Sequence, residues 1–191
     1  YFEANASAGV NPNLIINGDM RIAQRGTSFV SPSNGNYTLD RFLVSGGLTA
    51  NITVNQSTEV PNNTFINSLH VDVTTAKASL ASSDLLRVQQ KVEGLNAAVL
   101  GLGTADNQSF TLSFWVRSSV TGNHVVTITP TSGTTQYYPA IYSVSVADTW
   151  EQISVTIPGT ALGTFNRSNG VGFQVEFMMA AGTDWEATAN T

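Results

Sequence analysis

The chain has 191 residues, of which 41% are hydrophobic and only 11% are charged. This length suits one domain with a packed core, and the apolar content excludes a wholly disordered chain. Polarity comes from uncharged residues, with 23 Thr, 19 Ser and 17 Asn beside 16 Gly. Thr favours strands, whereas Asn, Ser and Gly favour turns, so the composition predicts an all-β domain and not a helical bundle.

Charge and cysteine content exclude several partners and cofactors. The net charge is −5, and the eight Lys and Arg residues form no run. Binding to nucleic acid needs a clustered basic face, so nucleic acid is not an expected partner. The absence of cysteine excludes disulfides and thiolate metal sites. No apolar run approaches the roughly 20 residues that span a bilayer, so we expect no membrane insertion. We also expect no cofactor.

The chain begins with a short segment that has no periodic pattern. Residues 1–13 are small and polar, and they lack both an initiating Met and a signal-peptide pattern. We expect this segment to be a linker from a longer chain and residues 14–191 to form the folded domain.

Short strand patterns recur at steady spacing after a turn at Asn17-Gly18-Asp19. Large apolar residues occupy the even positions of 110–116 and the odd positions of 173–177, which is the period of half-buried antiparallel strands. About nine such strands predict a jelly-roll β-sandwich of antiparallel strands. Its core should include Leu112, Phe114, Phe173, Val175 and Phe177. The strands are expected at 37–44, 51–56, 68–74, 86–93, 109–117, 125–131, 140–146, 152–157 and 171–178.

One of these segments fits two structures. Residues 83–94 fit a helix that Ser83 caps and Gly94 ends. They also fit a strand with Val88 and Val92 facing inward, although Gln90 would then interrupt the apolar face. The residues alone leave both alternatives open.

The evidence for catalysis is thin. No known catalytic motif is present, and the thirteen acidic residues are too scattered to nominate a glycoside-cleaving pair, so we expect no enzyme. Asp40 and Arg41 are adjacent in an expected strand and predict a structural ion pair. Asp19 and Asp184 are weak candidate Ca²⁺ ligands, since nothing in their spacing brings them together.

A binding surface is the better-supported interpretation. Strand parity places Trp115 opposite the apolar face of its strand. An aromatic side chain among amide and charged side chains is typical of sugar binding. The aromatic ring stacks on the C–H face of the sugar, while the amide and charged groups form hydrogen bonds with its hydroxyls. If three strands lie side by side, one face presents Trp115, Arg117, Gln174, Glu176, Arg87, Gln89 and Lys91. The alternative is that Trp115 packs under a loop or against a neighbouring subunit. Tyr137 and Tyr138 are secondary aromatic candidates, for which packing is again the alternative.

Several stretches carry a family resemblance. Residues 13–26 read NLIINGDMRIAQRG and residues 37–42 read YTLDRF. Together they resemble the opening of a group of tailed-phage virion proteins, which are tail-fibre or tail-associated domains with a carbohydrate-binding-module-like jelly roll. The similarity continues at 89–96, 111–119, 149–151, 157–159 and 169–172, and it favours the strand for the ambiguous segment.

The resemblance implies a function, a location and partners. It implies a place on the phage virion, in a tail fibre or similar appendage, and a recognition or structural role. Together with the predicted polar face, it leads us to expect recognition of host-surface glycans. It also implies a homo-oligomer, most commonly a trimer, in contact with other virion proteins. The alternatives are a structural joint or decoration domain, and a glycan-cleaving tail enzyme. Related proteins continue past a segment like 183–186 into a further strand, so we expect that strand to be missing or supplied by a partner.

Overall fold

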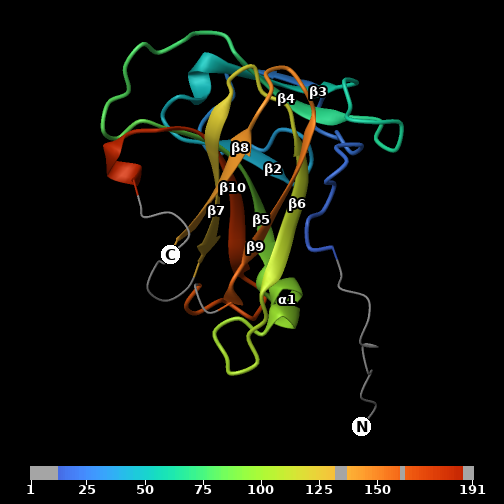
Figure 1. Cartoon of the computed structure of the whole chain (residues 1–191), viewed down its shortest axis with the longest axis vertical. Helices are drawn as coiled ribbons and strands as arrows, with labels where there is room; N and C mark the ends of the chain where they lie inside the picture. The colour runs from blue at the N-terminus through green and yellow to red at the C-terminus, as the bar shows by residue number, and fades with distance from the viewer. Residues whose placement is uncertain (1–12, 132–136, 160–161, 187–191) are drawn as a thin grey trace.

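The computed structural model describes residues 13–131, 137–159 and 162–186, which form an antiparallel β-sandwich (Figure 1). Residues 1–12 of the expected linker at 1–13, and the last residues, 187–191, lie outside this description. No helix among the described residues is long and apolar enough to cross a membrane. The strands are β1 (Ser28–Val30), β2 (Phe42–Ser45), β3 (Ile52–Ser57), β4 (Ser68–Val73), β5 (Leu85–Glu93), β6 (Phe110–Val116), β7 (Gly122–Pro130), β8 (Tyr138–Val144), β9 (Glu151–Ile157) and β10 (Val171–Ala181).

A five-stranded sheet in the order β2-β5-β10-β7-β8 forms one layer, and every neighbouring pair in it is antiparallel. Two smaller sheets, β1-β3-β4 and β6-β9, cover one face of it. Short helices lie in the loops: η1 (Thr49–Asn51), α1 (Gly94–Ala97), η2 (Ala98–Leu100) and η4 (Thr183–Trp185). This arrangement confirms the all-β sandwich predicted from composition and strand spacing.

The core lies in two clusters under the two smaller sheets. The first contains the predicted residues Leu112, Phe173 and Val175, and the predicted Phe114 and Phe177 pack against it while partly buried. The Phe114 ring meets Tyr142 and Phe177 edge to face, with centroids 5.1 and 5.0 Å apart, a geometry that aromatic pairs prefer. The second cluster joins β2 and β5 to β3. Alternation along the strands therefore identified the inward faces correctly.

The ambiguous segment is strand β5, and its polar interruption is a buried clamp. Gln90 faces the core and is only 1% exposed. Its amide Nε2 donates to the carbonyl of Ile16 over 2.9 Å, and its Oε1 accepts from the Ile16 N–H over 2.8 Å. The carboxamide thus pairs with a backbone residue as another strand would. Ile15, the preceding residue, packs against both core clusters.

The strand expected at 37–44 is interrupted by a turn. Phe42 donates its N–H to the Leu39 carbonyl over 2.9 Å, and Arg41 has a φ of +74°, which is costly for a residue with a Cβ. β2 therefore begins only at Phe42, while Tyr37 forms an isolated bridge with Leu43. The predicted Asp40–Arg41 ion pair is wrong, because the turn directs the two side chains to different partners.

A second hydrogen-bond clamp joins this turn to the N-terminal turn. The Asn17 amide donates to the carbonyls of Ile22 and Asp40, each over 2.9 Å. Its side-chain oxygen accepts the Ile22 N–H, also over 2.9 Å. The conspicuous Asn-Gly-Asp sequence is therefore structural, and it positions the Asp40 turn.

We expect Gln90→Ala to destabilise the domain by about 2–3 kcal/mol, because it leaves the Ile16 N–H and carbonyl without their partner and opens a cavity. Urea unfolding would measure the loss. Gln152→Ala on the exposed face of β9 is the matched control and should change stability by under about 0.5 kcal/mol. Equal effects of the two substitutions would contradict the clamp.

Candidate functional site

The outer face of the five-stranded sheet, turned away from the two smaller sheets, carries most of the predicted polar residues. Arg87, Gln89 and Lys91 project from β5 on the side opposite Val88, Gln90 and Val92. In the β5–β10 register, Lys91 is opposite Gln174 and Gln89 is opposite Glu176. The prediction that these two strands share a polar face is therefore correct.

Trp115 and Arg117 do not belong to this face. Within the described residues, β6 pairs with β9 in the other layer, so Trp115 lies on the far side of the sandwich and opposite Gln152. The Arg117 guanidinium donates to the Asp148 carbonyl over 2.9 Å and pairs with Glu59. The predicted seven-residue surface is wrong in this respect, because strand parity does not tell which sheet a strand joins.

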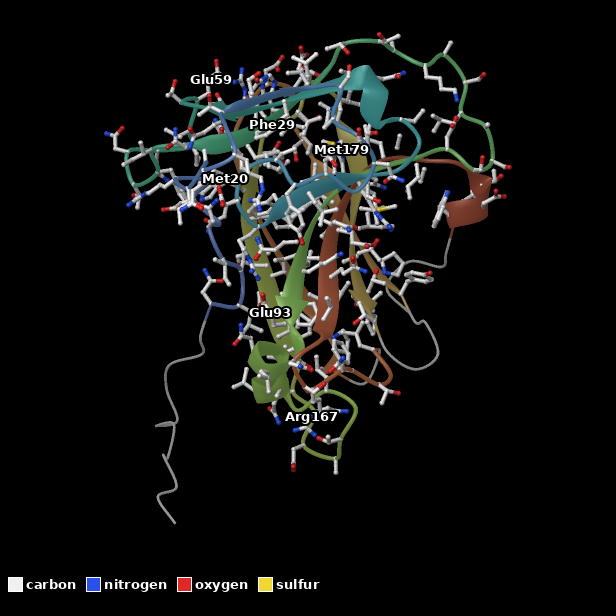
Figure 2. The ribbon with its side chains drawn as sticks, turned by 180° about the vertical axis from the view of Figure 1, so that it is seen from behind. Met20, Phe29, Glu59, Glu93, Arg167 and Met179 are labelled. Atoms are coloured by element: carbon white, nitrogen blue, oxygen red, sulfur yellow. The ribbon has the colours of Figure 1, made fainter. Side chains whose placement is uncertain are left out.

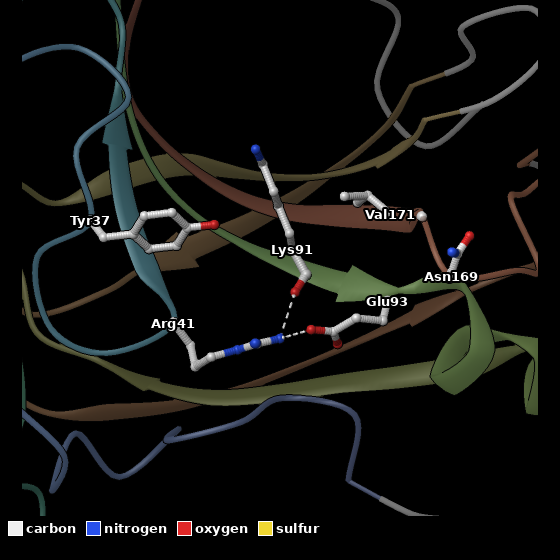
Figure 3. Close-up of a pocket in the computed structure, with 7 residues that line it drawn as sticks. Tyr37, Arg41, Lys91, Glu93, Asn169 and Val171 are labelled. Carbon is white, nitrogen blue, oxygen red and sulfur yellow. Dashed lines mark hydrogen bonds and ion pairs between the residues drawn. The ribbon is translucent and has the colours of Figure 1, made fainter.

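At the Glu93 end of the outer face lies a hollow of about 500 Å³, part of it open to solvent (Figure 3). We call it the Tyr37 pocket. Of its lining, only Lys91 was a predicted site residue. The others lie in the stretches 37–42, 89–96 and 169–172. Neither the residue composition nor the strand periodicity of these stretches singles out any one of them as a site residue. The pocket is lined by Tyr37, Arg41, Lys91, Glu93, Asn169, Gly170 and Val171.

The Tyr37 ring is held from one side and is 40% exposed. The Arg25 guanidinium lies 5.3 Å from the ring centroid, which is cation–π range. Arg25 also pairs with Asp40 over 3.3 Å, and Asp40 accepts the Gln24 N–H over 2.6 Å. Arg25 therefore lies over the ring of a residue that also lines the pocket.

Arg41 and Glu93 form an ion pair across the pocket (Figure 3). Arg41 also reaches the Lys91 carbonyl over 3.5 Å, and Glu93 accepts from the Asn96 amide over 3.3 Å. The hydrogen bond from Arg41 lowers the pKa of Glu93, so this carboxylate is ionised at neutral pH. The strained backbone of Arg41 thus places a fixed donor and a fixed acceptor side by side.

A close backbone approach brings the 166–170 loop to the pocket. The Gly94 N–H donates to the Gly170 carbonyl over 2.7 Å. A Cβ at position 94 would overlap the carbonyl oxygens of Asn166 and Ser168, so only glycine fits there. Glu93 and Arg167 consequently lie toward the same end of the molecule (Figure 2), and Asn169 lines the pocket.

The middle of the outer face is a buried polar cluster and not an open surface. Glu176 is 1% exposed and Gln89 is 4% exposed. Glu176 accepts from Arg87 over 3.2 Å and from the Thr129 hydroxyl over 2.9 Å. One oxygen of Glu176, one of Gln89 and the Arg87 Nε are buried without a partner in the structure. Gln89 and Glu176 are therefore too enclosed to be direct sugar contacts, contrary to the prediction.

Burial raises the pKa of the Glu176 carboxyl, against the opposing effects of the Arg87 charge and the Thr129 hydroxyl. Removing a carboxylate from water disfavours its charged form, and two partners do not compensate fully. This buried acid therefore makes stability sensitive to pH.

The remaining candidates lie elsewhere. Tyr138 is 6% exposed and packs in the first core cluster, whereas Tyr137 is 47% exposed. Asp19 pairs with Arg21 over 2.7 Å, and Asp184 lies in η4. Among the described residues, no three His, Cys, Asp or Glu side chains gather into a group that could hold a metal ion.

No family model matches this chain, and no curated protein matches it. One similar solved structure is the enzymatically active domain of tailspike protein 4 of bacteriophage CBA120, with a TM-score of 0.47 and 16% sequence identity. The match covers 80% of this chain but 20% of the other, so this chain spans about a fifth of that protein's length. An overlap this loose assigns no function to the present chain.

We expect Glu176→Gln to gain stability relative to the native protein as pH rises from about 4 to about 8. A carboxyl with a raised folded-state pKa contributes most stability when protonated, and that contribution is lost as pH rises through the folded-state pKa. The variant lacks this titrating carboxyl. The effects of all other carboxyls cancel in the difference between the free energies of unfolding of the variant and the native protein. Urea unfolding at several pH values would measure it.

The matched control is Glu186→Gln, at an exposed glutamate. Its stability difference from the native protein should stay nearly flat over the same pH range. A difference for Glu176→Gln that is flat, or that falls with pH, would contradict the burial argument.

Proposed function

We propose that this domain is a glycan-binding module on the surface of a tailed-phage virion, in a tail fibre or similar appendage, and that the Tyr37 pocket is its sugar site. The observation that carries the proposal is the composition of the pocket. A half-exposed aromatic ring faces a fixed ion pair, an amide and a lysine. All of its lining residues also fall within the stretches through which the chain resembles phage virion proteins.

The pocket chemistry suits a pyranose ring. The partly exposed Tyr37 ring can stack on the C–H face of a sugar, which contributes about 1 kcal/mol beyond area burial. The Arg41–Glu93 pair offers a donor and an acceptor to neighbouring hydroxyls, and Asn169 adds an amide that can do both. A shallow pocket with few contacts binds a single sugar weakly, at about millimolar affinity.

Binding without cleavage is the proposed mode of action. Hydrolysis of a glycoside uses two carboxyl groups about 5–9.5 Å apart. The two glutamates that the outer face places on β5 and β10 are Glu93 and Glu176, and Glu176 is opposite Gln89, four residues from Glu93. At about 3.3 Å per residue, their backbone positions are about 13 Å apart along the strand direction. Because Glu176 is buried, its carboxyl group also cannot reach the glycosidic bond of a sugar in the pocket.

Attachment to a host would depend on several copies of the domain. A homotrimer, as the resemblance implies, presents three pockets on one particle, so that the second and third contacts form at high effective concentration. Millimolar sites can then hold a particle firmly while each contact remains reversible.

A structural joint that binds other virion proteins is the second candidate, and one surface favours it. Leu95 in α1 and Val99 in η2 are 66% and 56% exposed, and Ile16 is 40% exposed. With Leu14 and Asn96 they line a second hollow, whose apolar rim is typical of protein docking.

We expect Tyr37→Ala to weaken binding of the 191-residue chain to bacterial surface polysaccharide about tenfold, since the stacking plane is lost. Binding to an array of immobilised polysaccharides from candidate hosts would measure this. Tyr137→Ala is the matched control, because Tyr137 is similarly exposed at 47% but does not line the pocket.

Trp115→Ala tests which of the two faces of the sandwich binds the polysaccharide. Under the proposal it leaves binding unchanged. Loss of binding in Trp115→Ala but not in Tyr37→Ala would move the site to the β6–β9 face. Absence of any polysaccharide binding by the native chain would favour the structural joint.

A further inference from the structure

The cations of this chain are almost all neutralised by a specific carboxylate. Six of the eight Lys and Arg residues form ion pairs: Arg21, Arg25, Arg41, Lys77, Arg87 and Arg117. The other two, Lys91 and Arg167, have no ion pair with any described carboxylate. A protein with a net charge of −5 has acidic groups to spare, so two unpaired cations stand out.

One of these two cations, Lys91, lies in the Tyr37 pocket. Lys91 lines it, projecting from β5 beside the Arg41–Glu93 pair (Figure 3). Arg167 is exposed and lies two residues before Asn169, in the loop that the Gly94–Gly170 hydrogen bond draws against the pocket. With two cations, Arg41 and Lys91, against one carboxylate, Glu93, the pocket lining carries a net positive charge on an otherwise acidic molecule.

The pocket has no internal partner for this charge. Arg41 and Glu93 cancel each other, and the hydrogen bond between them keeps Glu93 ionised and engaged. Lys91 is thus left with its ammonium group available on the same side as the exposed Tyr37 ring. An ammonium beside an aromatic plane matches a ring compound with a negative substituent.

We infer that the ligand of the Tyr37 pocket is a negatively charged sugar, with a uronic acid as the simplest form. This inference rests on the proposed function and specifies its ligand class. The sugar carboxylate pairs with the Lys91 Nζ, the pyranose C–H face stacks on Tyr37, and hydroxyls contact Arg41, Glu93 and Asn169.

The test compares matched charged and neutral sugars on the 191-residue chain. D-glucuronate and D-glucose, and D-galacturonate and D-galactose, are titrated at low salt while backbone amide shifts are followed by NMR. At least one uronate should perturb the amides of 91–94 and 169–171, with about three- to fivefold higher affinity than its neutral partner. About 0.5 M salt should remove that preference.

Lys91→Met keeps the aliphatic stem and should make the two members of a pair equal in affinity. Lys77→Met is the matched control, because Lys77 pairs with Asp84 outside the pocket and should leave the preference unchanged. Equal affinity of the native chain for charged and neutral sugars, still lost in Tyr37→Ala, would overturn the charge inference and leave the glycan proposal standing. Binding of none of the four sugars, together with no polysaccharide binding, would overturn both.

Discussion

The hydrogen bonds between the Gln90 carboxamide and the Ile16 backbone are the interaction on which the rest of the structure depends. They bind a non-strand segment to the core face of the central sheet, with the geometry of a strand pairing. A buried amide is costly unless both its donor and its acceptor are satisfied, so this site accepts the Ile16 backbone in one register only. Ile15 is thereby placed between the two core clusters, where it contacts both.

The same segment connects the core to the Tyr37 pocket. Beyond Ile16 the chain turns at Asn17, whose side chain bonds the Asp40 carbonyl. Asp40 in turn receives Arg25, and Arg25 lies over the Tyr37 ring. The strain at Arg41 is stored in this turn and directs its guanidinium to Glu93. A chain of specific polar contacts therefore holds the aromatic ring, which is the preorganisation that the proposed sugar site requires.

The outer face of the central sheet divides into two environments. Around Glu176 the side chains are enclosed and bond one another, which suits them to structure and makes them sensitive to pH. Around Lys91 the face opens into the hollow beside Tyr37, and a cation there lacks a described partner. The same alternation of residues thus produces a buried cluster and an accessible site within one strand, β5.

The sequence by itself determined the all-β class, the inward residues of the strands and the shared polar face of β5 and β10, because a period of two depends only on neighbouring residues. It did not decide that Gln90 clamps a backbone segment, that residues 37–44 contain a turn, or that β6 lies in the opposite layer from β5. The clamp depends on a contact between residues 74 positions apart, the turn is held by a contact between residues 23 positions apart, and the place of β6 depends on the choice of sheet. The Tyr37 pocket combines three distant stretches, so only the tertiary structure could assemble it.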